Sequence, residues 1–156
     1  MDQLRRTLLK GAGASSAIAA AVAAGVLKPT QVWAAEWNKA AFEAKDLDGA
    51  LKNFGAAGAA ESKDVTIKAP DIAENGAVVP IEIASTVPNT QQISVFIDKN
   101  PLPLAASFDF ANGAQPSVAV RLKMGQTSNI RAVAKADGKF YSATKEVKVT
   151  VGGCGG

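Results

Sequence analysis

From residue 63 onward, apolar and polar residues alternate along the chain in a series of short runs. In the first of them, Thr66 separates Val65 from Ile67. Alternation puts every second side chain on one face of a strand, so each run predicts a strand with one face in a core and one in solvent. Similar runs occupy 81–83, 93–97, 118–122 and 147–151, with a less regular one at 130–135.

Residues that favour turns separate these runs. The turn signals are Glu74-Asn75-Gly76, Pro88-Asn89, Asn100-Pro101, Asn112-Gly113 and Asp137-Gly138. The last of them lies between two predicted strands and is typical of a β-hairpin. About seven short strands with this spacing predict an immunoglobulin-like antiparallel β-sandwich over residues 63–151. No helix-length segment follows residue 63, which argues against parallel βαβ units.

The segment 36–54 has the spacing of a helix instead, within an expected helical lead-in over residues 35–62. Gly49 weakens its middle, so either one helix or two short helices joined near residues 46–48 are expected, and the run from Gly55 to Gly58 ends the segment. We expect its apolar stripe to pack onto the sheet, which makes the fold mainly β with a short N-terminal helical segment. The stripe consists of Trp37, Ala41, Phe42, Leu47, Ala50, Leu51 and Phe54.

The first 34 residues have the order of a secretory signal peptide. Arg5 and Arg6 precede an uncharged, Ala-rich stretch at 11–27, and small residues follow at the predicted cleavage point between Ala34 and Ala35. The arginine pair and the weak hydrophobicity indicate twin-arginine export to the periplasm. A membrane-spanning helix is the alternative, but it needs roughly 20 strongly apolar residues. We therefore expect the signal to be cleaved and the mature protein to leave the membrane.

Removal of the signal changes the charge of the protein. Of the 17 Lys and Arg residues, four lie in residues 1–34, which leaves 13; of the 14 Asp and Glu residues, one lies there, which also leaves 13. The mature chain is formally neutral, so the net charge of +3 belongs to the signal. The sequence therefore predicts neither nucleic acid nor an anionic membrane surface as a partner.

The composition excludes several common chemistries. The chain has no His and a single Cys, so it cannot assemble a Ser-His-Asp or Cys-His site or a usual zinc site, and we expect no metal. Two carboxylate pairs, Asp46 with Asp48 and Asp71 with Glu74, fall on segments that resemble exposed turns. Solvated charge explains them better than catalysis does.

The single cysteine, Cys154, lies between two glycine pairs at the end of the chain. We call Gly152–Gly156 the C-terminal arm. A buried structural cysteine needs neighbours to pack with, and glycine supplies none, so we expect a mobile, exposed thiol that is used. From Val151 the thiol reaches on the order of 10 Å. The arm offers no cation or helix N-terminus to activate the thiol, so other proteins are expected to act on it.

The signal with Arg5 and Arg6, the helical lead-in, the sandwich strands and the complete Gly-Gly-Cys-Gly-Gly terminus together resemble SoxY, the sulfur-compound carrier subunit of the bacterial thiosulfate-oxidising Sox system. The resemblance implies a carrier without enzymatic activity, with no cofactor beyond a covalent sulfur adduct on Cys154. Gly152, Gly153, Gly155 and Gly156 would form its swinging arm.

The resemblance also implies partners. A c-type cytochrome would load thiosulfate, a hydrolase would release sulfate, and a sulfane dehydrogenase would oxidise the remaining sulfur. A heterodimer with SoxZ, another β-sandwich protein, is expected as well. Phe96, Phe108 and Phe110 are candidates for its contact surface, although ordinary core packing explains them better.

Two other hypotheses use the same cysteine. An exported interaction module would join Cys154 to itself or to a partner through a disulfide, although a structural disulfide gains from fixed geometry rather than from glycine. A thiol enzyme would turn over substrate by itself, and the missing His and cation count against it.

Overall fold

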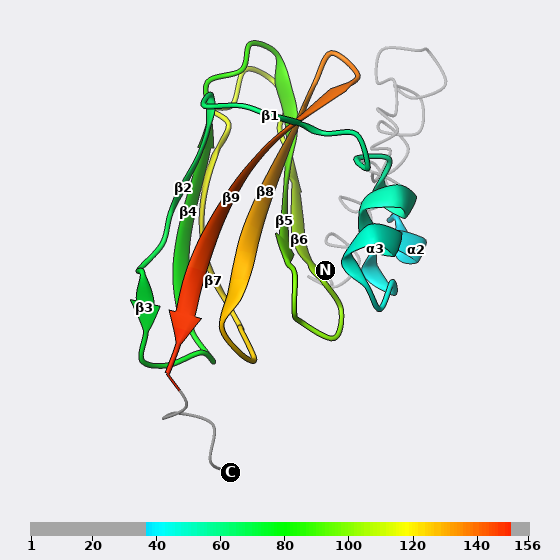
Figure 1. The fold of residues 1–156 in the computed structure, drawn as a ribbon. Coiled ribbons are helices and arrows are strands. Elements are labelled where there is room, and N and C mark those ends of the chain that lie inside the picture. The colour runs from blue at the N-terminus through cyan, green and yellow to red at the C-terminus, as the bar shows by residue number, and fades with distance from the viewer. Residues whose placement is uncertain (1–36, 151–156) are drawn as a thin grey trace, which may run out of the picture. The chain divides into compact units, whose positions relative to one another are not determined.

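The described part of the chain, residues 37–150 of a computed structural model, begins with two short helices and continues as nine strands (Figure 1). The helices are α2 (Lys39–Phe42) and α3 (Leu47–Phe54). The strands are β1 (Ala60–Glu61), β2 (Val65–Lys68), β3 (Ile72–Ala73), β4 (Val79–Ser85), β5 (Thr90–Ile97), β6 (Leu104–Asp109), β7 (Ser117–Leu122), β8 (Ser128–Ala136) and β9 (Lys139–Val149).

Local residue choices explain why the helical segment divides into two. The side chain of Asp46 accepts a hydrogen bond from Gly49 N at 2.7 Å and so caps the start of α3. Gly55 ends α3 in the left-handed conformation, with φ of 85°, which glycine adopts without steric cost. Of the two arrangements that the sequence left open, two short helices is the one that forms.

The strands form two sheets. The large sheet has the order β1-β9-β8-β5-β6, with β3 also paired to β9, and the small sheet has the order β2-β4-β7. The hairpin between β8 and β9 forms as predicted, with positive φ values of 49° at Asp137 and 76° at Gly138. The sheets are antiparallel except where β1 and β3 pair in parallel with β9.

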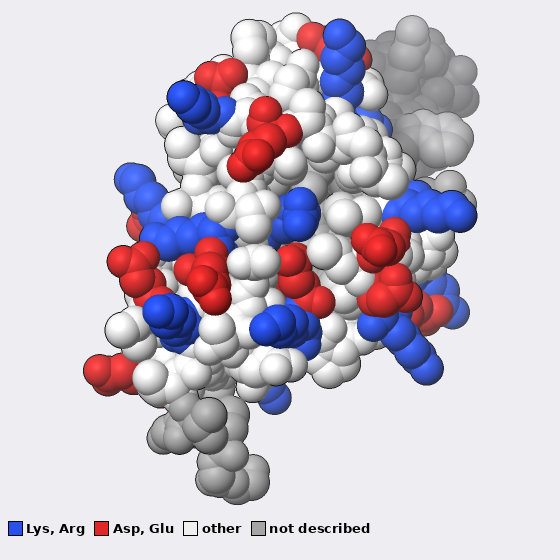
Figure 2. Space-filling view, viewed as in Figure 1, with Lys and Arg blue, Asp and Glu red and all other residues white. Residues whose placement is uncertain are grey.

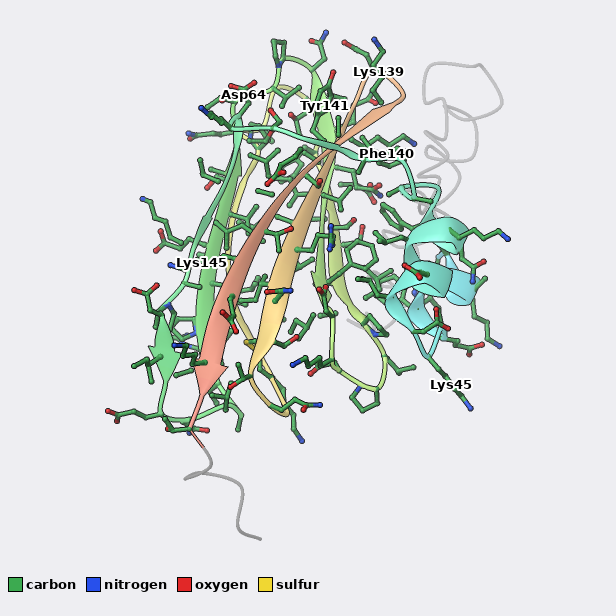
Figure 3. All side chains as sticks on the ribbon, in the orientation of Figure 1. Lys45, Asp64, Lys139, Phe140, Tyr141 and Lys145 are labelled. Carbon is green, nitrogen blue, oxygen red and sulfur yellow. The ribbon has the colours of Figure 1, made fainter. Side chains whose placement is uncertain are left out.

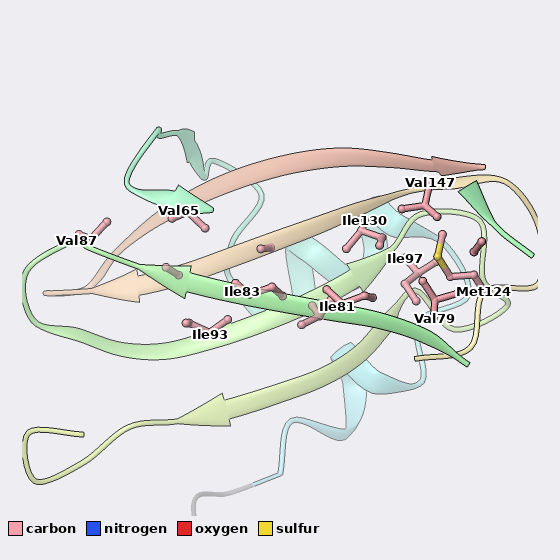
Figure 4. Packing of buried hydrophobic residues seen from close by; sticks show 14 of the residues in the cluster. Val65, Val79, Ile81, Ile83, Val87, Ile93, Ile97, Met124, Ile130 and Val147 are labelled. Atoms are coloured by element: carbon pink, nitrogen blue, oxygen red, sulfur yellow. The ribbon is translucent and has the colours of Figure 1, made fainter. Parts of the chain in front are cut away.

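The core between the sheets confirms the predicted alternation in most strands, but not in β5, where Ser94 and Phe96 on the outer face are buried as well, because the helices cover that face. Inward-facing side chains of both sheets are buried, among them Ile81, Ile83, Ile93, Ile97 and Ile130 (Figure 4). Met124, from the loop between β7 and β8, lies among Val79, Ile97 and Val147 at one end of this core. The fold is therefore a mainly β, immunoglobulin-like sandwich with a helical lead-in, as the pattern predicts.

A second cluster covers the outer face of the large sheet. The ring of Phe54 from α3 lies edge-on to Phe96 of β5 and Phe140 of β9, with ring centroids 5.7 and 6.0 Å apart (Figure 3 labels Phe140). The expected packing of the apolar helical stripe onto the sheet is confirmed, except at Trp37. That side chain remains 67% exposed, although its ring lies 5.7 Å from that of Phe42.

The three phenylalanines considered for a partner surface are core residues. Phe96 is fully buried beneath the helices. Phe108 and Phe110 are half-buried and pack against the core between the sheets. The interpretation of ordinary core packing is confirmed for all three.

Strand β6 was missed by the alternation analysis because its sequence, Leu-Ala-Ala-Ser-Phe-Asp, contains small residues on both faces. It pairs with β5, and the hydroxyls of Ser94 and Ser107 share a hydrogen bond of 2.8 Å across the pair. β1 and β3 were also missed, since two residues are too few to show a period.

Candidate functional site

The residues predicted to carry the chemistry lie outside the described residues. They comprise Cys154 and the arm glycines Gly152, Gly153, Gly155 and Gly156, and also the signal residues Arg5, Arg6, Ala34 and Ala35. What the structure does describe is the point from which the arm starts, the end of β9 at Val149 and Thr150.

We call the end of the sandwich at which β9 ends the arm end. It comprises β3 and the loops 74–78, 98–103 and 123–127 (Figure 1). The opposite end, the far end, comprises the turns 86–89, 110–116 and 137–138.

Hydrogen bonds hold the end of β9 from both sides. On one side, Ala73 O of β3 accepts a hydrogen bond from Thr150 N at 3.1 Å. Just before β3, Asp71 O accepts one from Lys148 N at 3.0 Å. On the other side, Thr127 Oγ1 accepts from Val149 N at 3.0 Å. The base of the arm is therefore held in place up to Thr150.

Gly76 permits the close packing beneath this base. A Cβ at this position would lie 2.4 Å from Met124 O and 2.7 Å from a methyl group of Val149. Its carbonyl accepts from Met124 N at 2.7 Å, and the Met124 side chain is 1% exposed. Only glycine allows the backbones of loops 74–78 and 123–127 to approach so closely.

The remaining loop of the arm end is tied to its neighbours by side chains. The Asn100 side chain donates to Lys123 O at 2.8 Å and accepts from Gly125 N at 3.3 Å. Ser128 Oγ accepts from Lys99 N at 3.0 Å. Loops 98–103 and 123–127 therefore form one connected support under the end of β9.

Lys145 closes the edge of β9 just before the arm. Lys145 lies on the same face of β9 as Val147, and its Nζ donates to Ala69 O at 2.7 Å and lies 3.0 Å from the Asp71 carboxylate (Figure 3). Within the described residues, positions 143–147 of β9 have no strand partner on this side, between the pairings with β1 and β3, and a charge at such an open edge is a common protection against unwanted strand pairing. Here it also fixes the segment that leads into β3.

The paired carboxylates have structural or solvated positions. Asp46 caps α3, Asp71 pairs with Lys145, and Asp48 and Glu74 are exposed. All four residues are exposed, as the interpretation as solvated charge expects, and Asp46 and Asp71 have structural roles besides. Within residues 37–150 no group of three His, Cys, Asp or Glu side chains is placed to hold a metal ion.

Two further features complete the described surface. A cleft of about 600 Å³ opens at the far end, between the turns 86–89 and 110–116, away from the base of the arm. No helix in the described part of the chain is long and apolar enough to cross a membrane.

Sequence reasoning missed the residues that support the arm. Asn75-Gly76 was recognised as a turn, but nothing in the sequence indicates that Gly76 contacts Met124 and Val149. Thr127 and Lys145 carry no local signal either. Their roles depend on partners 22 and 76 residues away, Val149 and Ala69.

Fold and sequence together define a class of protein. Proteins of this class have an immunoglobulin-like β-sandwich with a pair of helices on one face. A lone cysteine between glycine pairs follows β9 in the sequence. Comparison with known proteins narrows this class. One family description, "Sulfur oxidation protein SoxY", matches residues 51–154, which is most of the chain. The chain belongs to the SoxY family of sulfur oxidation proteins.

A solved relative agrees with this assignment. The sulfur carrier protein SoxY from Chlorobium limicola f. thiosulfatophilum is 43% identical, with a TM-score of 0.60, over 67% of this chain and 94% of that one. A PKD domain of an M14-like peptidase from a Thermoplasmatales archaeon is 20% identical, with a TM-score of 0.38, over 55% of this chain and 91% of that one, a likeness too low to carry an argument. No curated protein matches the sequence.

Proposed function

We propose that this protein is a periplasmic carrier without enzymatic activity, which holds thiosulfate-derived sulfur on Cys154 and presents it to partner enzymes. The observation that carries the proposal is the contrast at the end of β9. Hydrogen bonds hold the backbone up to Thr150, and a glycine-flanked thiol follows four residues later.

The length of the arm suits delivery. From Thr150 to Cys154 an extended chain spans about 14 Å at most, at about 3.3–3.6 Å per residue. A held base limits where the thiol can be, so less freedom is lost when it enters a pocket. Glycine on both sides allows the backbone to pass close to the walls of that pocket.

The covalent chemistry requires partners. Joining the Cys154 sulfur to the outer sulfur of thiosulfate forms an S–S bond, releases the thiol proton and yields two electrons. A c-type cytochrome would accept these electrons. Water then cleaves the bond between that outer sulfur and the sulfonate group, releasing sulfate and leaving a persulfide on Cys154. A sulfane dehydrogenase would oxidise the persulfide sulfur while it remains attached.

Two further features belong to the proposal. Arg5 and Arg6 would direct export by the twin-arginine route, with cleavage between Ala34 and Ala35. A SoxZ-like subunit would form a heterodimer with the sandwich. The export signal is argued from the residues of positions 1–34, and the SoxZ-like subunit from the resemblance to the SoxY family.

The experiment is the intact mass of the protein isolated from the periplasm of cells grown with and without thiosulfate, before and after reduction. We expect thiosulfate-dependent adducts that reductant removes and that Cys154→Ser abolishes. A matched control moves the thiol to the held base, in Cys154→Ser combined with Thr150→Cys. Thr150 is exposed, so iodoacetamide should still alkylate the new thiol, but partner enzymes should not load it.

Two results would contradict the proposal. If Cys154 is a fixed disulfide in both cultures, the chain is an interaction module. If the isolated protein turns over a sulfur compound by itself, it is a thiol enzyme.

A further inference from the structure

The tripeptide Asn-Gly-Ala occurs twice in the chain, once at each end of the sandwich. Residues 75–77 belong to loop 74–78 at the arm end, and residues 112–114 belong to turn 110–116 at the far end. Asparagine is a thermolabile residue, and a glycine after it has no Cβ to shield its backbone nitrogen, so both sites are candidates for deamidation. The local sequence is the same at both sites, so a difference between them must come from the structure.

Deamidation needs no reagent other than water. The backbone nitrogen of the following residue loses its proton, attacks the asparagine Cγ and displaces the side-chain nitrogen, which leaves as ammonia. Water then opens the cyclic succinimide at either of its carbonyl groups and leaves aspartate or isoaspartate. No atom is oxidised or reduced. Since the attacking nitrogen must rotate toward Cγ, a backbone that is held in place reacts only when it opens.

Several contacts hold the asparagine at the arm end. Asn75 Oδ1 accepts a hydrogen bond from Ala77 N at 2.9 Å, and Asn75 O accepts one from Val78 N at 3.3 Å. Gly76 is buried, and its carbonyl accepts from Met124 N at 2.7 Å. Rotation of the Gly76 nitrogen toward Asn75 Cγ would break these contacts, so the structure protects this site.

The asparagine at the far end lies in an open turn. Residues 111–115 are all exposed, and a Cβ at Gly113 would meet nothing within 4 Å besides its chain neighbours. A backbone hydrogen bond from Ala114 N to Ala111 O, 3.1 Å long, closes the turn. An exposed turn of this kind opens at little cost in free energy, so Gly113 N can reach Asn112 Cγ without disturbing the core.

We propose that Asn112 is a deamidation site of the folded protein, while Asn75, the other asparagine with the same following residues, is protected. The carboxylate that forms at residue 112 joins Asp137 in the lining of the far-end cleft. The proposal does not rest on the carrier function, because the modified turn lies at the end of the sandwich opposite to the base of the arm.

The charge of the chain makes the product detectable. Basic and acidic side chains are interspersed on the face seen in Figure 2. Residues 35–156 contain 13 Lys and Arg and 13 Asp and Glu, so a molecule of this span that deamidates has an excess of one negative charge. Isoelectric focusing separates it from the unmodified chain.

The test follows both sites in one sample. Purified full-length protein is incubated at mildly alkaline pH, and aliquots are digested at intervals under acidic conditions, where deamidation is slow. Mass spectrometry of the peptides identifies the products, because OH replaces NH2 at the modified residue. We expect residue 112 to convert about tenfold or more faster than residue 75, because Asn75 reacts only after its loop opens.

Two controls link this difference to the fold. In guanidinium chloride both loops are unfolded, so the two sites should convert at similar rates; this control requires no substitution and no folded variant. In the native protein, Asn112→Gln should prevent the acidic species from forming, because glutamine closes a larger ring more slowly. Asn75→Gln should leave that species unchanged.

Two results would overturn the proposal. If both sites convert equally fast in the folded protein, the contacts around Asn75 give no protection. If neither site converts in the folded protein while both convert in guanidinium chloride, the far-end turn is as well protected as the arm end. Neither result bears on Cys154, whose loading is measured separately.

Discussion

The two ends of the sandwich are both built from loops, but different interactions shape them. At the far end, three residues other than glycine adopt positive φ: Asn89 at 57°, Asn112 at 55° and Asp137 at 49°. Asn and Asp tolerate this conformation, so the backbone of each turn is encoded by its own residues, and one hydrogen bond of 3.0 Å from Asn89 Nδ2 to Asp137 Oδ2 joins two of the turns. At the arm end, Gly76 meets Met124, Asn100 bonds to Lys123 and Thr127 bonds to Val149, all contacts between segments far apart in sequence.

The difference follows from what each end supports. The far end reverses the chain three times and leaves an open cleft of about 600 Å³. The arm end holds the last described residues of the chain, the base of the proposed carrier arm. A fixed base requires contacts from several directions, which a local turn cannot supply. Substitutions of the same chemical kind should therefore have different effects at the two ends.

The largest effect is expected for Gly76→Ala at the arm end. The new methyl group would meet a backbone carbonyl at 2.4 Å, so loops 74–78 and 123–127 must separate. Overpacking of this kind costs about 1–3 kcal/mol, and backbone contact favours the upper end of that range. Urea denaturation measures the loss. Gly125→Ala is the matched control, since a Cβ at this position of the same end meets nothing within 4 Å. It should change the free energy of unfolding by no more than about 0.5 kcal/mol. Equal losses in the two variants would show that the close approach is unimportant.

A smaller effect is expected for Gly138→Ala at the far end. No atom lies within 4 Å of the new methyl group, so the cost arises only from the positive φ of 76°. That cost is about 1 kcal/mol. The same denaturation experiment should rank this variant between Gly125→Ala and Gly76→Ala. A loss larger than that of Gly76→Ala would reverse the comparison between the ends.

The most local effect, no larger than that of Gly138→Ala, is expected for Thr127→Val. The substitution keeps the shape of the side chain but removes the acceptor for Val149 N. One hydrogen bond contributes about 1 kcal/mol, so amide exchange at Val149 should accelerate about fivefold. Hydrogen exchange followed by NMR measures it. Thr144→Val, at an exposed position of β9, should leave the Val149 amide unchanged. Unaltered exchange in Thr127→Val would mean that β3 alone holds the base of the arm.

Much of the architecture was predictable because its causes are local. Alternation with a period of two identified β2, β4, β5, β7 and β9, a less regular run indicated β8, and Asp137-Gly138 identified the hairpin. Gly55 ended α3 because the left-handed conformation favours glycine. The glycine-flanked Cys154, one of the features that carry the family resemblance, is likewise visible in the consecutive residues Gly152–Gly156. Each of these signals lies within a few positions of the feature that it predicts.

Only the tertiary structure decided how those pieces meet. It assigned β6 to the edge beside β5, and it brought β1 and β3 into parallel pairing with β9. It also placed Gly76, Met124 and Thr127 under the base of the arm. The physical reason is that these arrangements depend on which distant strands share a register and which loops then lie within van der Waals contact. A sequence pattern specifies the faces of its own strand, whereas the partners of those faces exist only once the sheets have packed.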